Sequence, residues 1–292
     1  MTGWIIYNRD QLRINRWFAD ELLRHTGRFA SVRIVILEEL SFGTDRGELF
    51  FALRGAPMRA PDFAVVRAIC PLLSETLEEA GTRVFNRACI ARICNDKRLT
   101  HKLLRQGGVP SLRTVFCEKR FFDPAQAFGI DYPLVLKGAS GHGGREVWLV
   151  RSGEELAEFI KKLPEDGFLL QELLRPYGRD LRAYVLGGEI LGAVLRSSEG
   201  FRSNYSLGGK AVPYALNDEE RALVRRVLRC LPCPPDYIGV DLLPGPDGLI
   251  CNEIEDVVGA RMLYDACRTD AAALFCGHIQ ASLLRDPPAK GN

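Results

Sequence analysis

Short apolar runs alternate with amphipathic stretches over residues 1–85. Strands are predicted where apolar residues dominate, at 3–7, 32–37, 49–53, 63–67 and 84–85. Apolar residues recur with helical spacing over 11–25 and 71–80. Strands that alternate with helices predict an α/β fold, with a small parallel sheet and helices on its faces. No GxGxxG motif follows the first strand, so the pattern does not indicate a dinucleotide site there.

Hairpin patterns replace this alternation in the rest of the chain and give those parts α+β character. Helices are predicted at 86–95, 96–107, 154–162, 217–228 and 270–284. Strands are predicted at 133–137, 146–150, 167–171, 183–186, 190–196, 238–243 and 249–255. Gly187-Gly188 is typical of a tight type I′ turn between two strands. The terminal segment 287–292 is expected to be disordered.

Three carboxylates lie on the predicted hairpin that spans 238–255. Glu253 and Glu255 point to the same face of one strand, because side chains alternate along a strand, and Asp241 lies on the partner strand. Carboxylates on one surface repel each other unless a positive charge lies between them. A hard divalent cation, bound through these oxygens and also held by phosphates, is the interpretation that this pattern favours.

A lysine and a glycine loop suggest where such phosphates would bind. Lys137 ends an apolar strand, where an ammonium avoids the cost of burial only if it meets an anion. Gly141, Gly143 and Gly144 follow in the loop 138–144, and glycines let backbone N–H groups approach phosphate oxygens closely. The spacing is not that of a Walker A loop. Alone the loop would indicate a plain hairpin turn, and His142 within it is expected to be exposed to solvent.

The segment Glu172-Leu173-Leu174 follows a predicted strand and suits an adenine pocket, with apolar walls and backbone hydrogen bonds. Asp180 could accept hydrogen bonds from ribose hydroxyls. The alternative is a crossover between domains, held by a charge cluster of Arg179 and Asp180.

Positive charge is dense between 182 and 210. Arg182, Arg196, Arg202 and Lys210 belong to this group. Planar guanidinium groups bind oxyanions in a bidentate manner, so these arginines could compensate the carboxylates or bind an acyl phosphate. The alternative for any one of them is a solvated surface.

Composition and charge exclude several classes of function. The 292 residues are 47% hydrophobic and 26% charged, as in ordinary globular proteins, and are enough for about two domains. A net charge of +2 gives no electrostatic reason to expect a nucleic-acid partner. No apolar run is long enough to span a bilayer, and the start of the chain soon turns polar, unlike a signal peptide. We therefore expect a cytoplasmic protein with no membrane partner.

The nine cysteines are scattered, which favours free thiols over a disulfide framework in the cytoplasm. Cys230 and Cys233 match a CxxC redox spacing, but no second CxxC completes a zinc site. A structural role is the favoured interpretation, with redox chemistry or zinc as alternatives.

Taken together, these residues resemble the ATP-grasp superfamily, and within it the RimK-like carboxylate–amine ligases. The matching segments are 85–86, 95–97, 108–110, 133–144, 171–172, 178–182, 201–204, 208–209, 239–241 and 252–255. The resemblance implies three parts: an N-terminal α/β domain with a doubly wound-like parallel sheet (1–95), a small central lid domain (96–175) and a C-terminal antiparallel-sheet domain (176–286). ATP would lie between the last two.

The resemblance also implies roles for single residues. Lys97, Lys137, Arg202, Ser203 and Asn204 would contact or face the phosphates, Glu172 and Leu173 the adenine, Asp180 the ribose, and Asp241, Glu253 and Glu255 would hold Mg²⁺. Two ions are expected, with Mn²⁺ as an alternative metal, and they would supply most of the charge neutralisation. Arg202 would stabilise the transferred phosphoryl group or the tetrahedral intermediate, and Arg182 and Arg196 are further candidate catalytic residues.

Two departures from the family pattern concern the metal and the substrates. Glu255 stands where the family usually has asparagine, and its extra negative charge should bind the metal more tightly or change the number of bound ions; it also leaves open an ATP-binding protein without catalysis. The segment 256–264 replaces a small, proline-containing segment near the acceptor side. Arg261 and Tyr264 within it are candidate substrate contacts, with ordinary helix packing as the alternative.

The predicted function is therefore an ATP-dependent ligase that activates a carboxylate as an acyl phosphate and joins it to an amine. The alternatives are a kinase on the same fold and an ATP-binding protein without catalysis. The expected partners are ATP and small-molecule or peptide substrates, and a homo-oligomer is left open.

Overall fold

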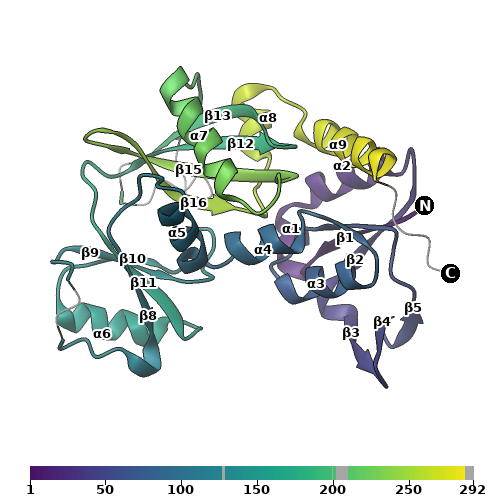
Figure 1. The fold of residues 1–292 in the computed structure, drawn as a ribbon, viewed down its shortest axis with the longest axis horizontal. Coiled ribbons are helices and arrows are strands. Elements are labelled where there is room, and N and C mark those ends of the chain that lie inside the picture. Colours follow the sequence, from purple (N-terminus) through teal and green to yellow (C-terminus); the bar gives the residue numbers. More distant parts are fainter. Residues whose placement is uncertain (127–128, 199, 202–209, 287–292) are drawn as a thin grey trace.

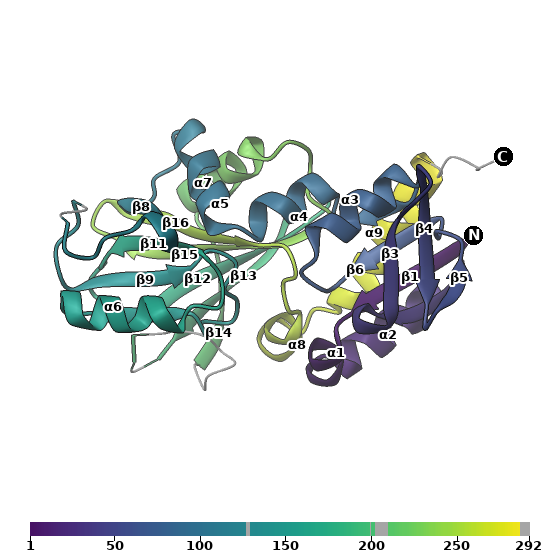
Figure 2. The same ribbon diagram turned by 90° about the horizontal axis from the view of Figure 1, so that it is seen from below.

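A computed structural model describes residues 1–126, 129–198, 200–201 and 210–286 of the chain. Three sheets follow one another along the long axis, and the C-terminal sheet lies between the N-terminal and central sheets (Figures 1 and 2). The mixed α/β class predicted from the sequence is confirmed. No helix among the described residues is both long and apolar enough to cross a bilayer.

The N-terminal sheet is parallel, as the alternation of strands and helices predicted. Its strands, in spatial order, are β2 (Ser31–Ile36), β1 (Thr2–Tyr7), β6 (Phe63–Val66) and β7 (Arg83–Phe85). Its chief helices are α1 (Arg9–Ile14), α2 (Arg16–Thr26) and α3 (Pro71–Glu79). The central strand β1 is buried from its second residue onward, because helices cover both faces of the sheet. One predicted helix over 11–25 is in fact two, which meet at Asn15.

A small antiparallel sheet extends this part of the chain. It comprises β3 (Leu40–Asp45), β4 (Glu48–Leu53) and β5 (Ala56–Met58), with the 3₁₀ turn η1 (Leu37–Glu39) before it. Only β4 was predicted as a strand. The sequence pattern missed β3 because most of its side chains are partly or fully exposed and many are polar.

The central sheet is antiparallel, in the order β10-β9-β11-β8. Its strands are β8 (Thr114–Glu118), β9 (Leu134–Gly138), β10 (Val147–Val150) and β11 (Gly167–Glu172), with the turn η2 (Lys119–Phe121) and the helix α6 (Gly153–Lys162). Two helices lead into it, α4 (Ala88–Cys94) and α5 (Lys97–Gln106), and α5 contacts both β11 and β16. The sequence pattern did not predict β8.

The C-terminal sheet is also antiparallel, in the order β14-β13-β12-β15-β16. Its strands are β12 (Arg179–Leu186), β13 (Glu189–Ser197), β14 (Lys210–Tyr214), β15 (Tyr237–Gly245) and β16 (Gly248–Glu255). The helices α7 (Asp218–Cys230), α8 (Arg261–Cys267) and α9 (Ala271–Arg285) complete it. Although α9 follows this sheet in the sequence, it packs against α2 of the N-terminal part (Figure 1). Neither β14 nor α8 was predicted.

Asn86 joins the N-terminal part to the C-terminal sheet. Its Oδ1 accepts hydrogen bonds from the backbone N–H groups of Asp236 (2.7 Å) and Tyr237 (2.8 Å). Its Nδ2 donates to the carbonyl oxygen of Tyr237 (2.8 Å) and to Oδ1 of Asp256 (2.6 Å). Since Asn86 is buried, each of these groups would lack a partner without it.

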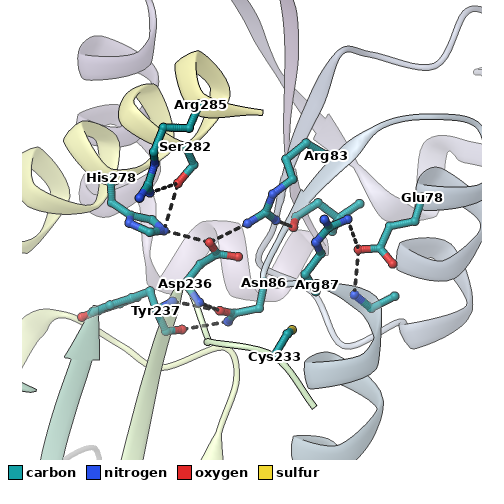
Figure 3. A network of polar contacts seen from close by, with 12 residues as sticks. Glu78, Arg83, Asn86, Arg87, Cys233, Asp236, Tyr237, His278, Ser282 and Arg285 are labelled. Atoms are coloured by element: carbon teal, nitrogen blue, oxygen red, sulfur yellow. Dashed lines mark hydrogen bonds and ion pairs between the residues drawn. The ribbon is translucent and has the colours of Figure 1, made fainter. Parts of the chain in front are cut away.

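Asp236 has polar partners from both sides of the same junction (Figure 3). One of its carboxylate oxygens lies 2.8 Å from Nη2 of Arg83 and 2.8 Å from Nε2 of His278 on α9. The Arg83 guanidinium also lies over the ring of Phe85, 4.1 Å from its centroid. The junction is therefore a polar network rather than an apolar contact alone.

The CxxC spacing does not bring its two cysteines into a common contact. Cys233 Sγ lies 3.6 Å from Sγ of Cys89 on α4. Cys230 Sγ instead contacts the carbonyl oxygen of Arg226, one turn earlier in α7, at 3.2 Å. All nine cysteines are free thiols.

The Asn86 contacts generate a prediction about stability. Replacing Asn86 by alanine should lower the free energy of unfolding by about 3 kcal/mol, because several buried polar groups lose their partners. Chemical denaturation of the purified variant measures this. Asn217→Ala, which removes only the side-chain cap of α7, is the matched control and should cost about 1 kcal/mol. An Asn86 variant no less stable than the cap variant would contradict the prediction.

Candidate functional site

A cleft of about 960 Å³, part of it open to solvent, lies between the central and C-terminal sheets. Its walls come from β9, β11, β12, β15 and β16, so strands distant in sequence share it. The predicted site residues that line it are Lys97, Lys137, Gly141, Gly143, Gly144, Glu172, Leu173, Asp180, Arg182, Arg196, Asp241, Glu253 and Glu255. The predicted residues Arg202, Ser203 and Asn204 lie outside the described part of the chain.

Two lysines enter the cleft from the central sheet and the helix beside it. Lys97, in the first turn of α5, is 4% exposed, and its Nζ lies 2.8 Å from Oε1 of Glu253. Its Nζ also donates to the carbonyl oxygen of Gly141 in the glycine loop. Lys137 on β9 donates to Oδ1 of Asn252 at 2.8 Å. Burial lowers the pKa of Lys137 to about 8, against the opposing charge of Glu253.

Asn252 is a site residue that the list of candidates missed. It sits in a bulge of β16, where Asp241 is paired with Glu253 but Leu242 with Cys251. Two residues on one strand therefore oppose one on the other. The sequence analysis selected the adjacent, charged Glu253. Strict alternation of side chains gives no reason to expect that Asn252 also lines the cleft.

Asp241 is buried between two arginines. Arg182 binds it in a bidentate manner, with Nε–Oδ1 and Nη2–Oδ2 distances of 2.7 Å. Arg196 Nη2 lies 2.7 Å from Oδ2 of the same carboxylate. Burial acts to raise the pKa of Asp241, but the two guanidinium groups outweigh it and hold that pKa well below its usual range. The carboxylate therefore stays ionised although it is almost completely buried.

The other two carboxylates also have cationic partners. Glu255 forms an ion pair with Nη1 of Arg182, and burial nevertheless raises its pKa. Burial acts to raise the pKa of Glu253, but the charge and hydrogen bond of Lys97, together with the charge of Lys137, lower it. The extra charge of Glu255 is thus matched within the protein.

The oxygen donors suit a hard cation such as Mg²⁺ by their chemistry. Asp241 stands directly opposite Glu253 in the ladder of β15 and β16, and the amide oxygen of Asn252 lies beside them. Within the described residues, however, no three carboxylate, histidine or cysteine side chains are grouped closely enough to hold a metal. The carboxylate oxygens are instead paired with Arg182, Arg196 and Lys97. The donor set fits a magnesium ion by its chemistry, and these ion pairs occupy the same oxygens.

Part of the cleft lining is apolar. Leu112, Val135 and Leu173 belong to it, and Glu172 Oε1, also at the cleft, accepts a hydrogen bond from the backbone N–H of Arg113 at 2.8 Å. Apolar walls with nearby backbone groups are what a planar heterocyclic ring requires.

The ionic partner of Asp180 and the position of Lys210 can be compared with the charge clusters predicted from the sequence. Asp180 pairs across the sheet with Arg196 (Nε–Oδ1 2.6 Å), and the described residues show no ion pair between it and Arg179. Lys210 is exposed at the start of β14, away from the residues that line the cleft.

The segment after β16 contacts helices rather than the cleft. Tyr264 donates a hydrogen bond to Oδ1 of Asp270 (2.5 Å), and its ring meets that of Trp17 edge-on, with centroids 4.4 Å apart. Arg261 is exposed at the start of α8. Helix packing is therefore the interpretation that the structure favours for Tyr264.

Two histidines lie behind the lysines. His142 was expected to be exposed but is half-buried, and burial lowers its pKa to about 4. His101 on α5 is 4% exposed, with Nε2 at 2.9 Å from Nε2 of Gln171. Burial, followed by the charge of Lys137, lowers the pKa of His101 to about 4. His101 does not line the cleft itself but contacts Gln171, which does.

Comparisons with known proteins agree with this geometry. A family model of the RimK-like ATP-grasp domain matches residues 94–279. Beta-citrylglutamate synthase B of Mus musculus is 30% identical over 271 residues, which cover 86% of this chain and 69% of the relative. N-acetylaspartylglutamate synthase A of the same organism is also 30% identical, over 86% of this chain and 70% of the relative. Among solved structures, D-cycloserine synthetase DcsG superposes with a TM-score of 0.74 at 17% identity, over 97% of this chain and 100% of that one.

The lowered pKa values of His101 and His142 predict that the folded protein loses stability in acid. The pKa of His101 is about 4 in the folded protein and 6.5 in the unfolded chain. Between these two pH values the unfolded chain binds more protons than the folded protein. Stability therefore falls as the pH drops from 6.5 towards 4. Relative to wild type, His101→Gln should lose less stability between pH 7.5 and 5, by up to about 2 kcal/mol. Urea denaturation at the two pH values measures the difference, and equal losses in both proteins would contradict it. His142 contributes in the same direction in both proteins.

Proposed function

Since the chain belongs to the RimK-like ATP-grasp family of ligases, we propose that it uses ATP and Mg²⁺ to activate a carboxylate as an acyl phosphate, which an amine then attacks. The observation that carries the proposal is one cleft with two buried lysines, a glycine loop, the buried carboxylate of Asp241 and the half-buried carboxylates of Glu253 and Glu255. Such a site matches the tail of a nucleoside triphosphate with its metal. An oxygen of the substrate carboxylate would attack the γ-phosphorus and ADP would leave. The amine would then attack the acyl carbon, lose a proton and displace phosphate.

The lysines and the glycine loop would hold the phosphates. Lys97 and Lys137 offer ammonium groups close to the loop that carries Gly141, Gly143 and Gly144. Phosphate oxygens would compete with Glu253 for Lys97 and would favour the charged form of Lys137. The roles that the resemblance gives to Arg202, Ser203 and Asn204 stay predictions.

The carboxylate row would hold the metal. Mg²⁺ bound by Asp241 and Glu253 would neutralise charge on the phosphates during transfer. Arg182 would then be released in part from Asp241, and its guanidinium could face developing negative charge at the reacting carboxyl group. The protein's task is to position charges, because phosphoryl transfer needs little covalent chemistry from it.

Glu255 supports an active enzyme rather than an inactive nucleotide-binding protein. From the sequence, this charge is expected to tighten metal binding or change the number of bound ions, and it leaves a protein without catalysis as an alternative. In the structure the same charge is paired with Arg182, so the site carries no uncompensated excess from it.

The names of the relatives suggest a first substrate. Beta-citrylglutamate synthase B and N-acetylaspartylglutamate synthase A both have glutamate in the name of their product. We infer that the amine substrate of this chain is an acidic amino acid, and L-glutamate is the first to test.

A turnover assay tests the ligase. Incubation with ATP, Mg²⁺, L-glutamate and a mixture of small carboxylic acids should release ADP and phosphate in equal amounts, with a new amide found by mass spectrometry. Glu253→Gln should lower the rate by at least about 100-fold, because one metal ligand loses its charge. Release of AMP and pyrophosphate, or a stable phosphorylated product without an amide, would overturn the proposal in favour of another chemistry.

Lys137→Ala should weaken ATP binding by about 10-fold or more without unfolding the protein, since among the described residues the ammonium is hydrogen-bonded to the Asn252 side chain and faces the cleft. Titration calorimetry with a non-hydrolysable ATP analogue measures the affinity, and thermal melting reports the folded state. Lys162→Ala, on the exposed face of α6, is the matched control and should bind as wild type does. Loss of folding with full affinity in the folded fraction would contradict this role.

A further inference from the structure

Two thiols meet at the junction between the N-terminal part and the C-terminal sheet. Cys89 lies in the first turn of α4 and is exposed, and Cys233 lies between α7 and β15 and is half-buried. Their Sγ atoms are 3.6 Å apart, although 144 positions separate the two residues in the sequence. The sulfur atoms of a disulfide are about 2.0 Å apart, so these two atoms must approach by roughly 1.5 Å. Shared between the two side chains, this is a small rotation about each Cα–Cβ bond.

The backbone beside this thiol pair is held by hydrogen bonds. Asn86, three residues before Cys89, accepts a hydrogen bond at 2.7 Å from the backbone N–H of Asp236, three residues after Cys233. The two segments therefore pass each other in opposite directions, and equal steps from the contact of Asn86 with Asp236 lead to the two cysteines. The proximity of the sulfur atoms thus follows from the path of the backbone and not from side-chain rotation alone.

The sequence around Cys233 makes its backbone stiff. Pro232 precedes it, and Pro234 and Pro235 follow it. Proline fixes its own φ angle and restricts the residue before it to extended conformations. Cys89 is held in turn by the helix α4. Both thiols therefore keep their positions, and little conformational entropy is lost when a bond joins them.

The surroundings give the two thiols different reactivity. Burial raises the pKa of Cys233 to about 12, the hydrogen bond with Cys89 adds to the rise, and the positive charge of Arg87 opposes it. Cys233 therefore stays a thiol at neutral pH, and the thiolate is the form that attacks a disulfide. Cys89 is exposed, so a reagent from solution reaches it first. Figure 3 shows Cys233 with Arg87 and Asp236, the charged residues that act on its pKa.

The CxxC spacing in the sequence marks the right cysteine but the wrong partner. Cys230 Sγ contacts the carbonyl oxygen of Arg226 within α7, whereas Cys233 Sγ contacts Cys89. A disulfide within the CxxC motif would need Cys230 to leave its helical contact. The pair that the fold brings together is the one between α4 and the segment before β15.

We propose that Cys89 and Cys233 are a modification site, at which a low-molecular-weight disulfide such as oxidised glutathione converts the two thiols into one reversible disulfide bond. The Cys89 thiolate attacks one sulfur of the small disulfide, whose S–S bond breaks, and one glutathione thiolate leaves. Cys233 then gives up its proton and attacks the Cys89 sulfur of this mixed disulfide, and the second glutathione thiolate leaves. The two cysteine protons pass to the two glutathione thiolates. The protein loses two electrons, which the small disulfide gains.

The bond would strengthen a contact that already exists. It would join the two segments that Asn86 holds together, and the loop that it closes contains the whole central sheet. A cross-link that closes a long loop restricts the unfolded chain and thereby stabilises the folded protein. Neither cysteine is among the described residues that line the cleft, so the modification is separate from the proposed ligase chemistry.

Oxidation of the purified, fully reduced protein with oxidised glutathione tests the site. Remaining thiols are blocked with N-ethylmaleimide, and tandem mass spectrometry of the digest locates any linked cysteines. A bond between Cys89 and Cys233 is expected in a product that runs as a monomer on a non-reducing gel. Its melting temperature should rise by about 5 °C or more above that of the reduced protein, and dithiothreitol should reverse the rise.

Three serine variants assign the roles. Cys230→Ser is the matched control, because Cys230 contacts Arg226 rather than Cys89, and it should form the same bond with the same rise in melting temperature. Cys89→Ser changes an exposed side chain, so it should fold and melt as the reduced wild type does, with no further rise on oxidation. Cys233→Ser should stop at a mixed disulfide of glutathione with Cys89.

Several results would overturn the inference. One is a wild-type protein in which Cys89 keeps its glutathione, or in which both thiols stay free to react with N-ethylmaleimide. Another is a bond between Cys230 and Cys233 in place of the expected one. A bond between Cys89 and Cys233 that leaves the melting temperature unchanged or lowers it would also count against the inference. These measurements need neither ATP nor a substrate, so their failure leaves the proposed ligase function untouched.

Discussion

The whole site depends on the ion pairs that surround Asp241. A carboxylate buried to this degree is tolerable only with cations at bonding distance, and Arg182 and Arg196 supply them from two neighbouring strands. The register of β12, β13 and β15 sets these distances, because Arg182 is opposite Asp241 and Arg196 is opposite Asp180. Replacing such a group by an apolar one need not destabilise a fold, so its presence reflects what the cleft must do with charge. The sheet acts as a rigid frame that holds alternating charges along one face.

Because positive and negative side chains alternate, the site differs from a pocket lined by charges of one sign. Each carboxylate already has a cationic partner within the protein, so an incoming metal or phosphate exchanges one ion pair for another rather than meeting a bare charge. The cost of removing these charges from water is then met when the protein folds, and the binding step involves an exchange of ionic partners. The polar network around Asn86 and Asp236 fixes the N-terminal part against the same sheet, which aligns the ends of its parallel strands with the charged face.

Local patterns in the sequence predicted the parts of this site that depend on short-range order. Side-chain alternation predicted that Glu253 and Glu255 share one face, and Lys137 was predicted as a site residue because it ends an otherwise apolar strand. All three residues line the cleft. The bulge at Asn252 breaks that alternation and could not be predicted from it. Asn86 owes its importance to contacts made 150 or more positions away in the sequence, at Asp236 and at Tyr237. The strand β14 and the helix α8 were missed because half-exposed segments carry little periodic signal.

The packing of α9 on α2 has a consequence for how the protein is made. Leu22 on α2 and Phe275 on α9 belong to one apolar cluster, although the ribosome adds them more than two hundred residues apart. A nascent chain that has completed its N-terminal strands still lacks α9. An apolar surface therefore stays exposed to solvent while the central and C-terminal sheets are synthesised. The N-terminal part therefore cannot complete its packing until one of the last segments is synthesised, and exposed apolar surface of this kind favours aggregation during that interval.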